Sequence, residues 1–167
     1  RTGSALTLND VQAIQPLTID RNTGNANVTV THNSTVDAGT SDSMTINVKN
    51  SSDAGTINVD GIETVNLVST DVPTDGANLI TVEATGSGTA TEVLNLSGIG
   101  DANVTALDAL TINNSIDGDL DLTPTVATTI NHTGTGTLEF SSDVEDVTIT
   151  ASGTGALDFT DAVVNGA

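Results

Sequence analysis

The sequence contains no cysteine, tryptophan or tyrosine, and only two phenylalanines occur among its 167 residues. Without cysteine, no disulfide can support the fold, so stability must come from the core, from repetition or from bound metal. Sugar-binding clefts usually stack pyranose rings on aromatic faces. The scarcity of aromatic rings therefore disfavours a lectin or a glycanase.

Basic residues are nearly missing as well. Three of them (Arg1, Arg21 and Lys49) stand against 22 acidic residues, and the formal net charge is −19. Nucleic-acid binding needs clustered Lys and Arg, and so does attraction to an anionic membrane surface, so we expect neither partner. The acidic residues repel one another. Multivalent cations are the simplest means of relieving that repulsion.

Long apolar runs are missing too. No stretch approaches the roughly 20 apolar residues of a transmembrane helix, and no signal peptide is visible. The chain begins with Arg1 rather than Met, so we expect a processed piece or a fragment of a larger protein. The length fits a single domain. A loop at 70–78 is a possible boundary between two parts of it.

What the sequence does contain is a short recurring unit. Branched apolar residues alternate with Thr, Asn or Asp, as in Leu94-Asn95-Leu96, and a turn rich in Gly, Asp, Ser and Thr follows. The unit returns about every 8–10 residues, a regular strand-and-turn spacing of the kind found in stacked architectures. Further examples are Leu110–Ile112, Leu120–Leu122, Leu138–Phe140, Val147–Ile149 and Leu157–Phe159. No helical periodicity is present, so the sequence predicts an all-β fold.

Two all-β architectures fit this pattern. In a β-solenoid, each strand pairs with the equivalent strand one coil later, whereas in a β-sandwich the strands pair as hairpins. Short units with few hairpin-type turn dipeptides favour the solenoid, and the narrow interior of a solenoid suits Val, Ile, Leu and Ala. With about 20 residues per coil and a strand spacing of about 4.8 Å, the stack would be about 40 Å long.

Loops that combine Asp, Thr, Ser, Asn and Gly offer the oxygen ligands that Ca²⁺ prefers. The sequence has neither an EF-hand loop nor the glycine-rich nonapeptide of calcium-binding β-rolls. We nevertheless expect at least one calcium site. The candidate ligands are Asp37 with Asp42; Asp53 with Asp60 and Glu63; Asp71 with Asp75; Asp101; and Asp117 with Asp119. Asp121 would project from the same outward face as the last pair, and the alternative interpretation of that face is a solvated strand.

Other chemistries are poorly supported. His32 and His132 lie on predicted strands without a partner motif, so we expect no catalytic residue and no enzyme. A β-helix polysaccharide lyase would need a basic proton acceptor, and the regular C-terminal half has none. Flat threonine ladders on solenoids can bind ice, but the Thr pairs here do not recur at one fixed position in every unit.

The segment Gly61-Ile62-Glu63-Thr64-Val65-Asn66-Leu67-Val68-Ser69-Thr70-Asp71 resembles bacterial calcium-dependent S-layer proteins and related type I-secreted surface proteins with repeats-in-toxin features. Leu79–Thr85 and Val93–Gly98 are similar to the next strands of that pattern. The resemblance implies a β-solenoid-like body, export without a cleaved signal, calcium in the turns and lateral assembly into a sheet.

Composition and resemblance together predict a structural domain of an S-layer protein at the bacterial cell surface. Its partners would be further copies of itself, with cell-surface polysaccharide contacted through regions outside this segment. The alternative is a repeat segment of a large secreted adhesin or biofilm-matrix filament. A polysaccharide lyase is the third and least favoured class.

Overall fold

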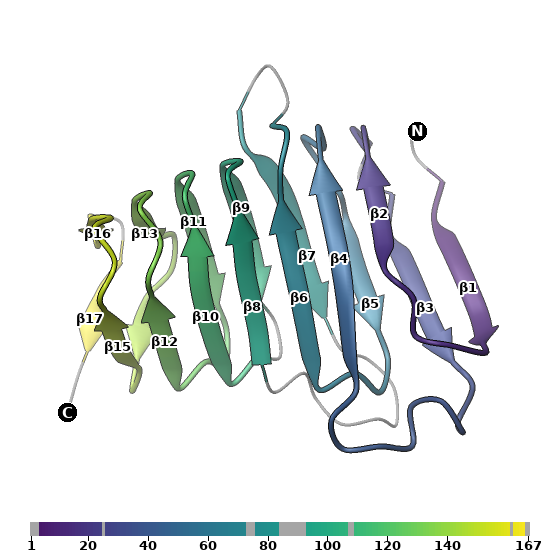
Figure 1. Cartoon of the computed structure of the whole chain (residues 1–167). Coiled ribbons are helices and arrows are strands. Elements are labelled where there is room, and N and C mark those ends of the chain that lie inside the picture. The colour runs from purple at the N-terminus through teal and green to yellow at the C-terminus, as the bar shows by residue number, and fades with distance from the viewer. Residues whose placement is uncertain are drawn as a thin grey trace.

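The computed structural model describes residues 4–24, 26–72, 76–83, 93–106, 109–160 and 162–165. All regular elements in these ranges are β-strands, and every pairing between these strands is parallel. Consecutive strands alternate between two large sheets, so the chain winds as a β-solenoid (Figure 1). The predicted solenoid is confirmed, and the alternative of hairpin-paired strands in a sandwich is not observed.

The seven-stranded sheet faces the viewer in Figure 1. In spatial order, from the C-terminal end of the stack to the N-terminal end, it contains β15 (Thr148–Ala151), β12 (Thr129–His132), β10 (Thr111–Ile116), β8 (Val93–Gly98), β6 (Thr64–Ser69), β4 (Ser43–Lys49) and β2 (Leu17–Asp20).

The eight-stranded sheet lies behind it. In the order from the N-terminal to the C-terminal end, it contains β1 (Leu6–Val11), β3 (Val28–His32), β5 (Thr56–Val59), β7 (Asn78–Glu83), β9 (Ala102–Ala106), β11 (Leu120–Pro124), β13 (Leu138–Phe140) and β16 (Leu157–Asp158). A small third sheet pairs β14 (Val144–Glu145) with β17 (Val164–Asn165).

The core lies between the two large sheets. Strand residues alternate between buried and partly exposed positions, as in β6, where Val65 and Leu67 are fully buried while Thr64 and Asn66 face outward. This alternation places apolar columns from both sheets inside, and those columns form one continuous hydrophobic cluster. At its C-terminal end the rings of Phe140 and Phe159 stack, with centroids 5.1 Å apart.

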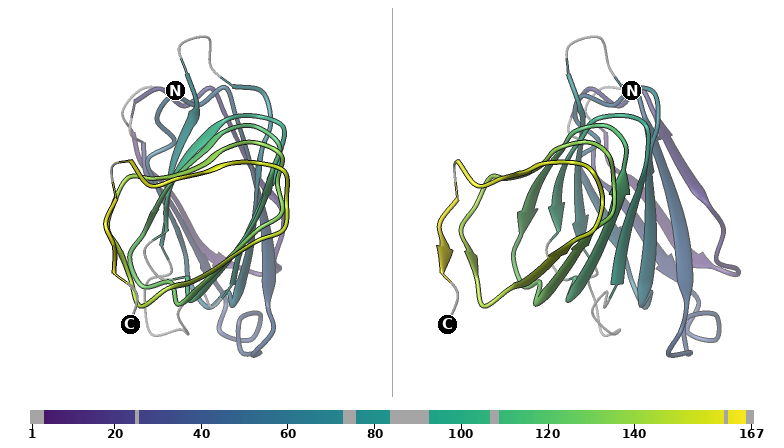
Figure 2. Two further views of the ribbon diagram at one scale, coloured as in Figure 1. Left: turned by 90° about the vertical axis from the view of Figure 1, so that its left-hand side faces the viewer. Right: turned by 60° about the vertical axis from the view of Figure 1, so that its left-hand side comes forward.

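The coils shorten along the chain. Equivalent residues of β8, β10 and β12 are 18 residues apart, whereas those of β6 and β8 are 29 apart. The extra N-terminal residues lie in the connections between strands, because β4, β6 and β8 pair in continuous register. The stack is continuous across the loop at 70–78, since β6 pairs directly with β8 and β7 with β9. The turned views of Figure 2 show successive coils following one another along a single axis.

Corner glycines allow the coils to approach closely. A Cβ atom placed on Gly136 would lie 1.8 Å from the carbonyl oxygen of Gly118 in the preceding coil, and one on Gly155 would lie 1.9 Å from that of Gly136. No side chain fits at such a distance from the backbone of the neighbouring coil. The Gly-rich turns noted in the sequence are therefore a packing requirement of the stack.

Candidate functional site

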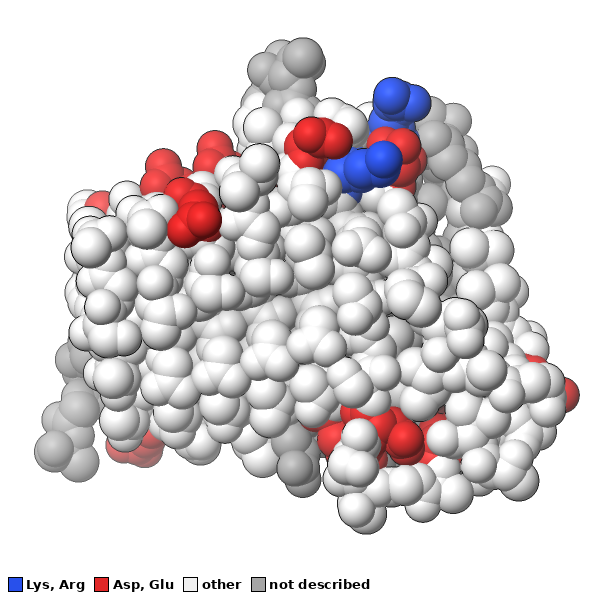
Figure 3. All heavy atoms as spheres, in the orientation of Figure 1, with Lys and Arg blue, Asp and Glu red and all other residues white. Residues whose placement is uncertain are grey.

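The acidic side chains gather along the two long edges of the solenoid. We call the edge where strands of the seven-stranded sheet end the upper edge, and the edge where they begin the lower edge, as in Figure 1. In Figure 3 the acidic atoms lie at the margins of the seven-stranded sheet, and its broad centre carries no charged group. The candidate cation sites therefore have to be sought at the edges.

Four predicted ligands, Asp37, Asp42, Asp60 and Glu63, lie along the lower edge. The loop 33–42, between β3 and β4, folds against the turn that joins β5 to β6. The backbone N–H of Asp42 donates a hydrogen bond to Oε2 of Glu63 (2.8 Å), and the Asp42 carbonyl accepts one from the N–H of Thr64 (3.0 Å). Asp37 packs against Gly61, where an added Cβ would lie 2.8 Å from its Oδ2. Asp60 is the residue before that glycine.

Burial distinguishes this corner. Glu63 is only 5% exposed, although it carries a carboxylate. Asp42 is half-buried, and among the described residues its Oδ2 atom is buried without a hydrogen-bond partner. A buried carboxylate oxygen without a donor is costly unless a cation or a proton compensates it. The corner therefore has a feature that bound calcium would satisfy.

The predicted grouping of Asp53 with Asp60 and Glu63 is wrong. Asp53 precedes β5 on the upper edge, whereas Asp60 and Glu63 follow that strand on the lower edge. The Oδ1 atom of Asp53 instead accepts a hydrogen bond from the N–H of Gly55 (3.0 Å) and so stabilises its own turn. The four residues of β5 separate Asp53 from Asp60 and Glu63.

Asp71 also lies on the upper edge, with an exposed side chain. Its backbone carbonyl accepts hydrogen bonds from the N–H of Asn50 (2.5 Å) and from Nδ2 of the buried Asn78 (3.3 Å). Asp75, the predicted partner of Asp71, lies outside the described residues. The predicted pairing of Asp71 with Asp75 is therefore not tested by the structure.

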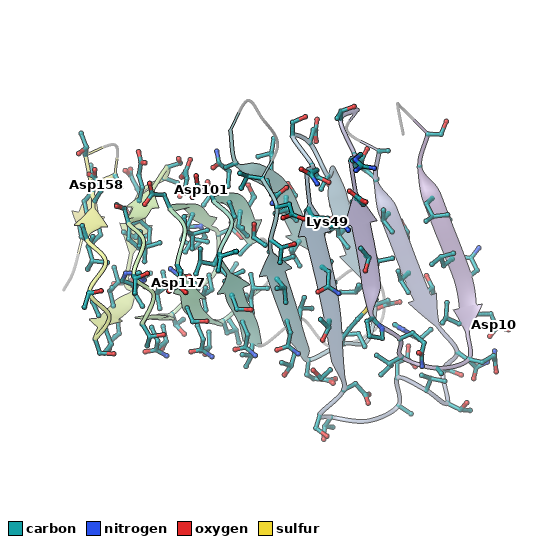
Figure 4. All side chains as sticks on the ribbon, turned by 45° about the horizontal axis from the view of Figure 1, so that its top comes forward. Asp10, Lys49, Asp101, Asp117 and Asp158 are labelled. Atoms are coloured by element: carbon teal, nitrogen blue, oxygen red, sulfur yellow. The ribbon has the colours of Figure 1, made fainter. Side chains whose placement is uncertain are left out.

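The upper edge uses its other carboxylates to join successive coils. Oδ1 of Asp101 accepts the N–H of Asp119, and Oδ1 of Asp119 accepts the N–H of Thr137, both at 2.9 Å. Oδ1 of Asp117 accepts the hydroxyl of Thr135 at 2.9 Å, and Asp121 accepts that of Ser141. Figure 4 shows Asp101, Asp117 and Asp158 on successive parts of the stack. These residues are neither free in solvent nor gathered around one point.

A shallow groove of about 350 Å³ follows this edge onto the eight-stranded sheet, and its acidic lining residues are Asp101, Asp119, Asp121 and Glu139. Asp121, Glu139 and Asp158 occupy one column of the sheet in register. The Thr160 hydroxyl, and then its N–H, lower the pKa of Asp158 by hydrogen bonding to its carboxylate. Sequence reasoning missed Glu139 and Asp158, although aligning the units at the coil period reveals the column.

Histidine does not contribute to these edges. Both histidines are buried: His132 is 0% and His32 is 5% exposed. Asn114 Nδ2 lies 2.9 Å from Nδ1 of His132, so this imidazole is a neutral acceptor in the core. Burial lowers the pKa of His132, and the nearby backbone of Gly155 offsets this only in part. Neither ring faces the groove lining.

Within the described ranges, no three acidic or histidine side chains converge closely enough to hold a metal ion between them. Ca²⁺ also accepts backbone carbonyls and water as ligands, so two carboxylates can suffice when carbonyls complete the shell. Asp42 and Glu63 fit that requirement best. The described residues also form no helix that could cross a membrane.

Comparison with known families, curated proteins and solved structures finds no match to this chain. A functional proposal therefore has to be built from the residues and their arrangement.

Proposed function

We propose that this chain is a structural segment of a bacterial cell-surface protein, a subunit of an S-layer lattice, and that calcium at its acidic edges stabilises it. The observation that carries the proposal is the buried Oδ2 atom of Asp42, which has no hydrogen-bond donor among the described residues. The backbone N–H of the same residue donates to the buried Glu63 carboxylate, in a chain of net charge −19. A bound divalent cation would offset both the local and the overall repulsion.

Asp42 and Glu63 would hold this ion, with backbone carbonyls of the loop 33–42 as further ligands. Asp37 and Asp60 lie at the same edge and would add negative potential without needing to touch the ion. Calcium supplies charge neutralisation there and performs no reaction. Because the loop 33–42 and the turn at 60–63 meet only in the folded chain, calcium would bind the folded state selectively.

This linkage gives the segment a physical switch between compartments. An ion that binds only the folded state stabilises it by about 2.7 kcal/mol at a hundredfold excess over its Kd. A few such sites would match the stability of an ordinary domain. The chain would remain loosely folded where calcium is scarce and would become rigid outside the cell.

The same chemistry would support assembly. The acidic groove on the upper edge presents the stacked carboxylates of Asp121 and Glu139 to solvent. Calcium bridging between such edges of neighbouring copies would join subunits that otherwise repel one another. In this proposal the segment is not an enzyme, and further regions of the protein would contact cell-surface polysaccharide.

The first test is a thermal melt followed by circular dichroism, in millimolar calcium, in EGTA and in magnesium. We expect calcium alone to raise Tm. Asp42→Asn should remove most of that rise, while Asp117→Asn, a matched change of an exposed carboxylate at the other edge, should leave it intact. Coincident melts in calcium and EGTA would contradict the calcium part of the proposal.

Electron microscopy of the protein in calcium tests the assembly part separately. A two-dimensional lattice is the expected result for an S-layer subunit. Single filaments would instead indicate a repeat of an adhesin or matrix fibre. Dispersed monomers under conditions where calcium does raise Tm would leave the calcium site intact and contradict lattice formation by this segment.

A further inference from the structure

The outer face of the seven-stranded sheet presents a regular, uncharged array. Two columns run side by side across β6, β8, β10, β12 and β15, and we call them together the Thr/Asn face. The first column contains Thr64, Val93, Thr111, Thr129 and Thr148, and the second contains Asn66, Asn95, Asn113, Asn131 and Thr150. Strand spacing sets the repeat along each column at about 4.8 Å, and the columns lie about 6.6 Å apart.

This array is not apparent from the sequence. As expected from the sequence, Thr pairs do not recur in every unit, but single threonines occupy one fixed position on four of these five strands, with Val93 on the fifth. Their spacing along the chain changes from 29 residues between β6 and β8 to 18 residues farther on. Only the pairing of strands aligns them in space. Neither of the two aligned columns contains Asp or Glu.

Hydrogen bonds hold the second column rigid. Nδ2 of Asn95 donates to Oδ1 of Asn66 (2.8 Å), Asn113 donates to Asn95 (2.9 Å) and Asn131 donates to Asn113 (2.8 Å). Asn66 donates in turn to the hydroxyl of Ser43 (2.9 Å). Each amide is fixed in orientation by its neighbours, so little side-chain entropy remains to be lost when the face binds a partner.

The absence of charge on this face is specific. The equivalent outward column of the eight-stranded sheet carries Asp121, Glu139 and Asp158 in register, although both sheets belong to the same coils. Figure 3 shows the outer face of the seven-stranded sheet as a continuous uncharged area bordered by acidic groups. A partner of this face therefore does not need a positive charge, and a cation is not what it would bind.

A second protein copy is a poor occupant. Five strands of about five residues span a flat area of about 400 Å², which is small for a standard interface, where each partner buries roughly 800 Å² of accessible surface. The face also lacks the Trp, Tyr and Arg that dominate interface energetics. The lack of aromatic rings argues equally against a glycan.

We propose that the Thr/Asn face binds ice. A rigid lattice of hydroxyl and amide groups, repeated in two dimensions, suits a partner that is itself a lattice. Equivalent oxygens in hexagonal ice repeat at nearly the spacing of adjacent strands, so waters held by successive Thr and Asn residues can join the crystal. Charged groups would orient water radially and disrupt that order, which accounts for their exclusion. This inference does not depend on the proposed surface-layer role.

The experiment measures thermal hysteresis and inhibition of ice recrystallisation with the whole chain. We expect the protein to shape ice crystals and to produce a measurable thermal hysteresis gap, which is the difference between the melting and freezing temperatures. Thr129→Lys, in the centre of the face, should reduce the gap by more than half. The matched control is Thr105→Lys, at an equally half-buried outward position on β9 of the opposite sheet, and it should retain the full gap.

A second variant guards against misfolding. Thr148→Lys changes an exposed residue at the end of the same column and should also lower the gap while circular dichroism stays unchanged. The proposal is overturned if the unmodified protein shows no hysteresis, or if the Thr105 variant loses as much as the Thr129 variant. It is also overturned if the face variants abolish self-association in sedimentation velocity, or binding to a neutral glucan, and leave ice growth unaffected.

Discussion

The asparagine ladder on the seven-stranded sheet should contribute to stability in proportion to the hydrogen bonds that each member makes. Asn113 lies inside the ladder: it donates to Asn95 and accepts from Asn131. Asn131 lies at its end, and among the described residues its side chain bonds only to Asn113, because the next residue of the column is Thr150. Replacing either asparagine by threonine follows the natural variation of this column, in which Thr45 and Thr150 are the terminal residues.

The expected magnitudes follow from this count. A net intramolecular hydrogen bond contributes about 0.5–1.5 kcal/mol, and these half-exposed amides belong at the lower end. Asn113→Thr should therefore reduce the free energy of unfolding by about 1–2 kcal/mol, and Asn131→Thr by about half as much. Threonine has a higher strand propensity than asparagine, but that gain is similar at both positions and cancels in the comparison.

Urea unfolding followed by circular dichroism measures both values, with an unchanged m-value as the check that the exposed surface is comparable. A double-mutant cycle of Asn95 and Asn113 should show a coupling energy of at least about 0.5 kcal/mol, because their side chains are in direct contact. The reasoning is refuted if Asn131→Thr costs as much as Asn113→Thr, or if both variants unfold like the unmodified protein.

Three further predictions concern the corners and the core. Gly136→Ala should cost more than about 2 kcal/mol in urea unfolding, because its Cβ would meet the Gly118 carbonyl; a near-neutral result would mean that the coils separate easily. Asp119→Ala should lower the free energy of unfolding by about 1 kcal/mol, because it leaves the N–H of Thr137 without its acceptor. Asp119→Asn keeps an acceptor and should be neutral or stabilising. If both variants lose the same stability, the effect comes from the charge of Asp119 and not from its hydrogen bond. Since burial lowers the folded pKa of His132 below its unfolded value of 6.5, the unfolded chain takes up the proton first and the free energy of unfolding should fall as pH decreases below that value. His132→Gln should flatten this dependence between about pH 7.5 and about pH 5.5, and an unchanged slope would exclude the imidazole as its origin.

The fold could be predicted from the sequence because its signals are local. Apolar residues at every second position, as at Leu120 and Leu122, indicate strands with one buried face, and both side chains are buried in the structure. Turn residues at short, regular intervals leave no room for helices. The shortage of hairpin turns favours strands that pair with later coils. Each of these signals lies within about ten residues, that is, within one strand and its turn. Over that length, the separation of residues along the sequence determines their separation in space.

The candidate sites could be predicted only in part, since proximity across coils is not local. Asp53 and Glu63 are ten positions apart in the sequence but lie on opposite edges, because a strand carries the chain from one edge to the other between them. Asp42 and Glu63 are farther apart in sequence, yet they share a hydrogen bond because the loop 33–42 folds against the next coil. Sequence grouping by distance along the chain therefore failed for the first pair.

The sequence by itself determined that this protein is an acidic, disulfide-free stack of β-strands with an aliphatic core, because composition and alternation act residue by residue. Only the tertiary structure decided which carboxylates meet, which are used to join coils, and which face is free of charge. Because the coils differ in length, equivalent residues are unevenly spaced along the sequence. Backbone hydrogen bonds between the strands nevertheless align these residues in space. That alignment turned scattered threonines and asparagines into one continuous face.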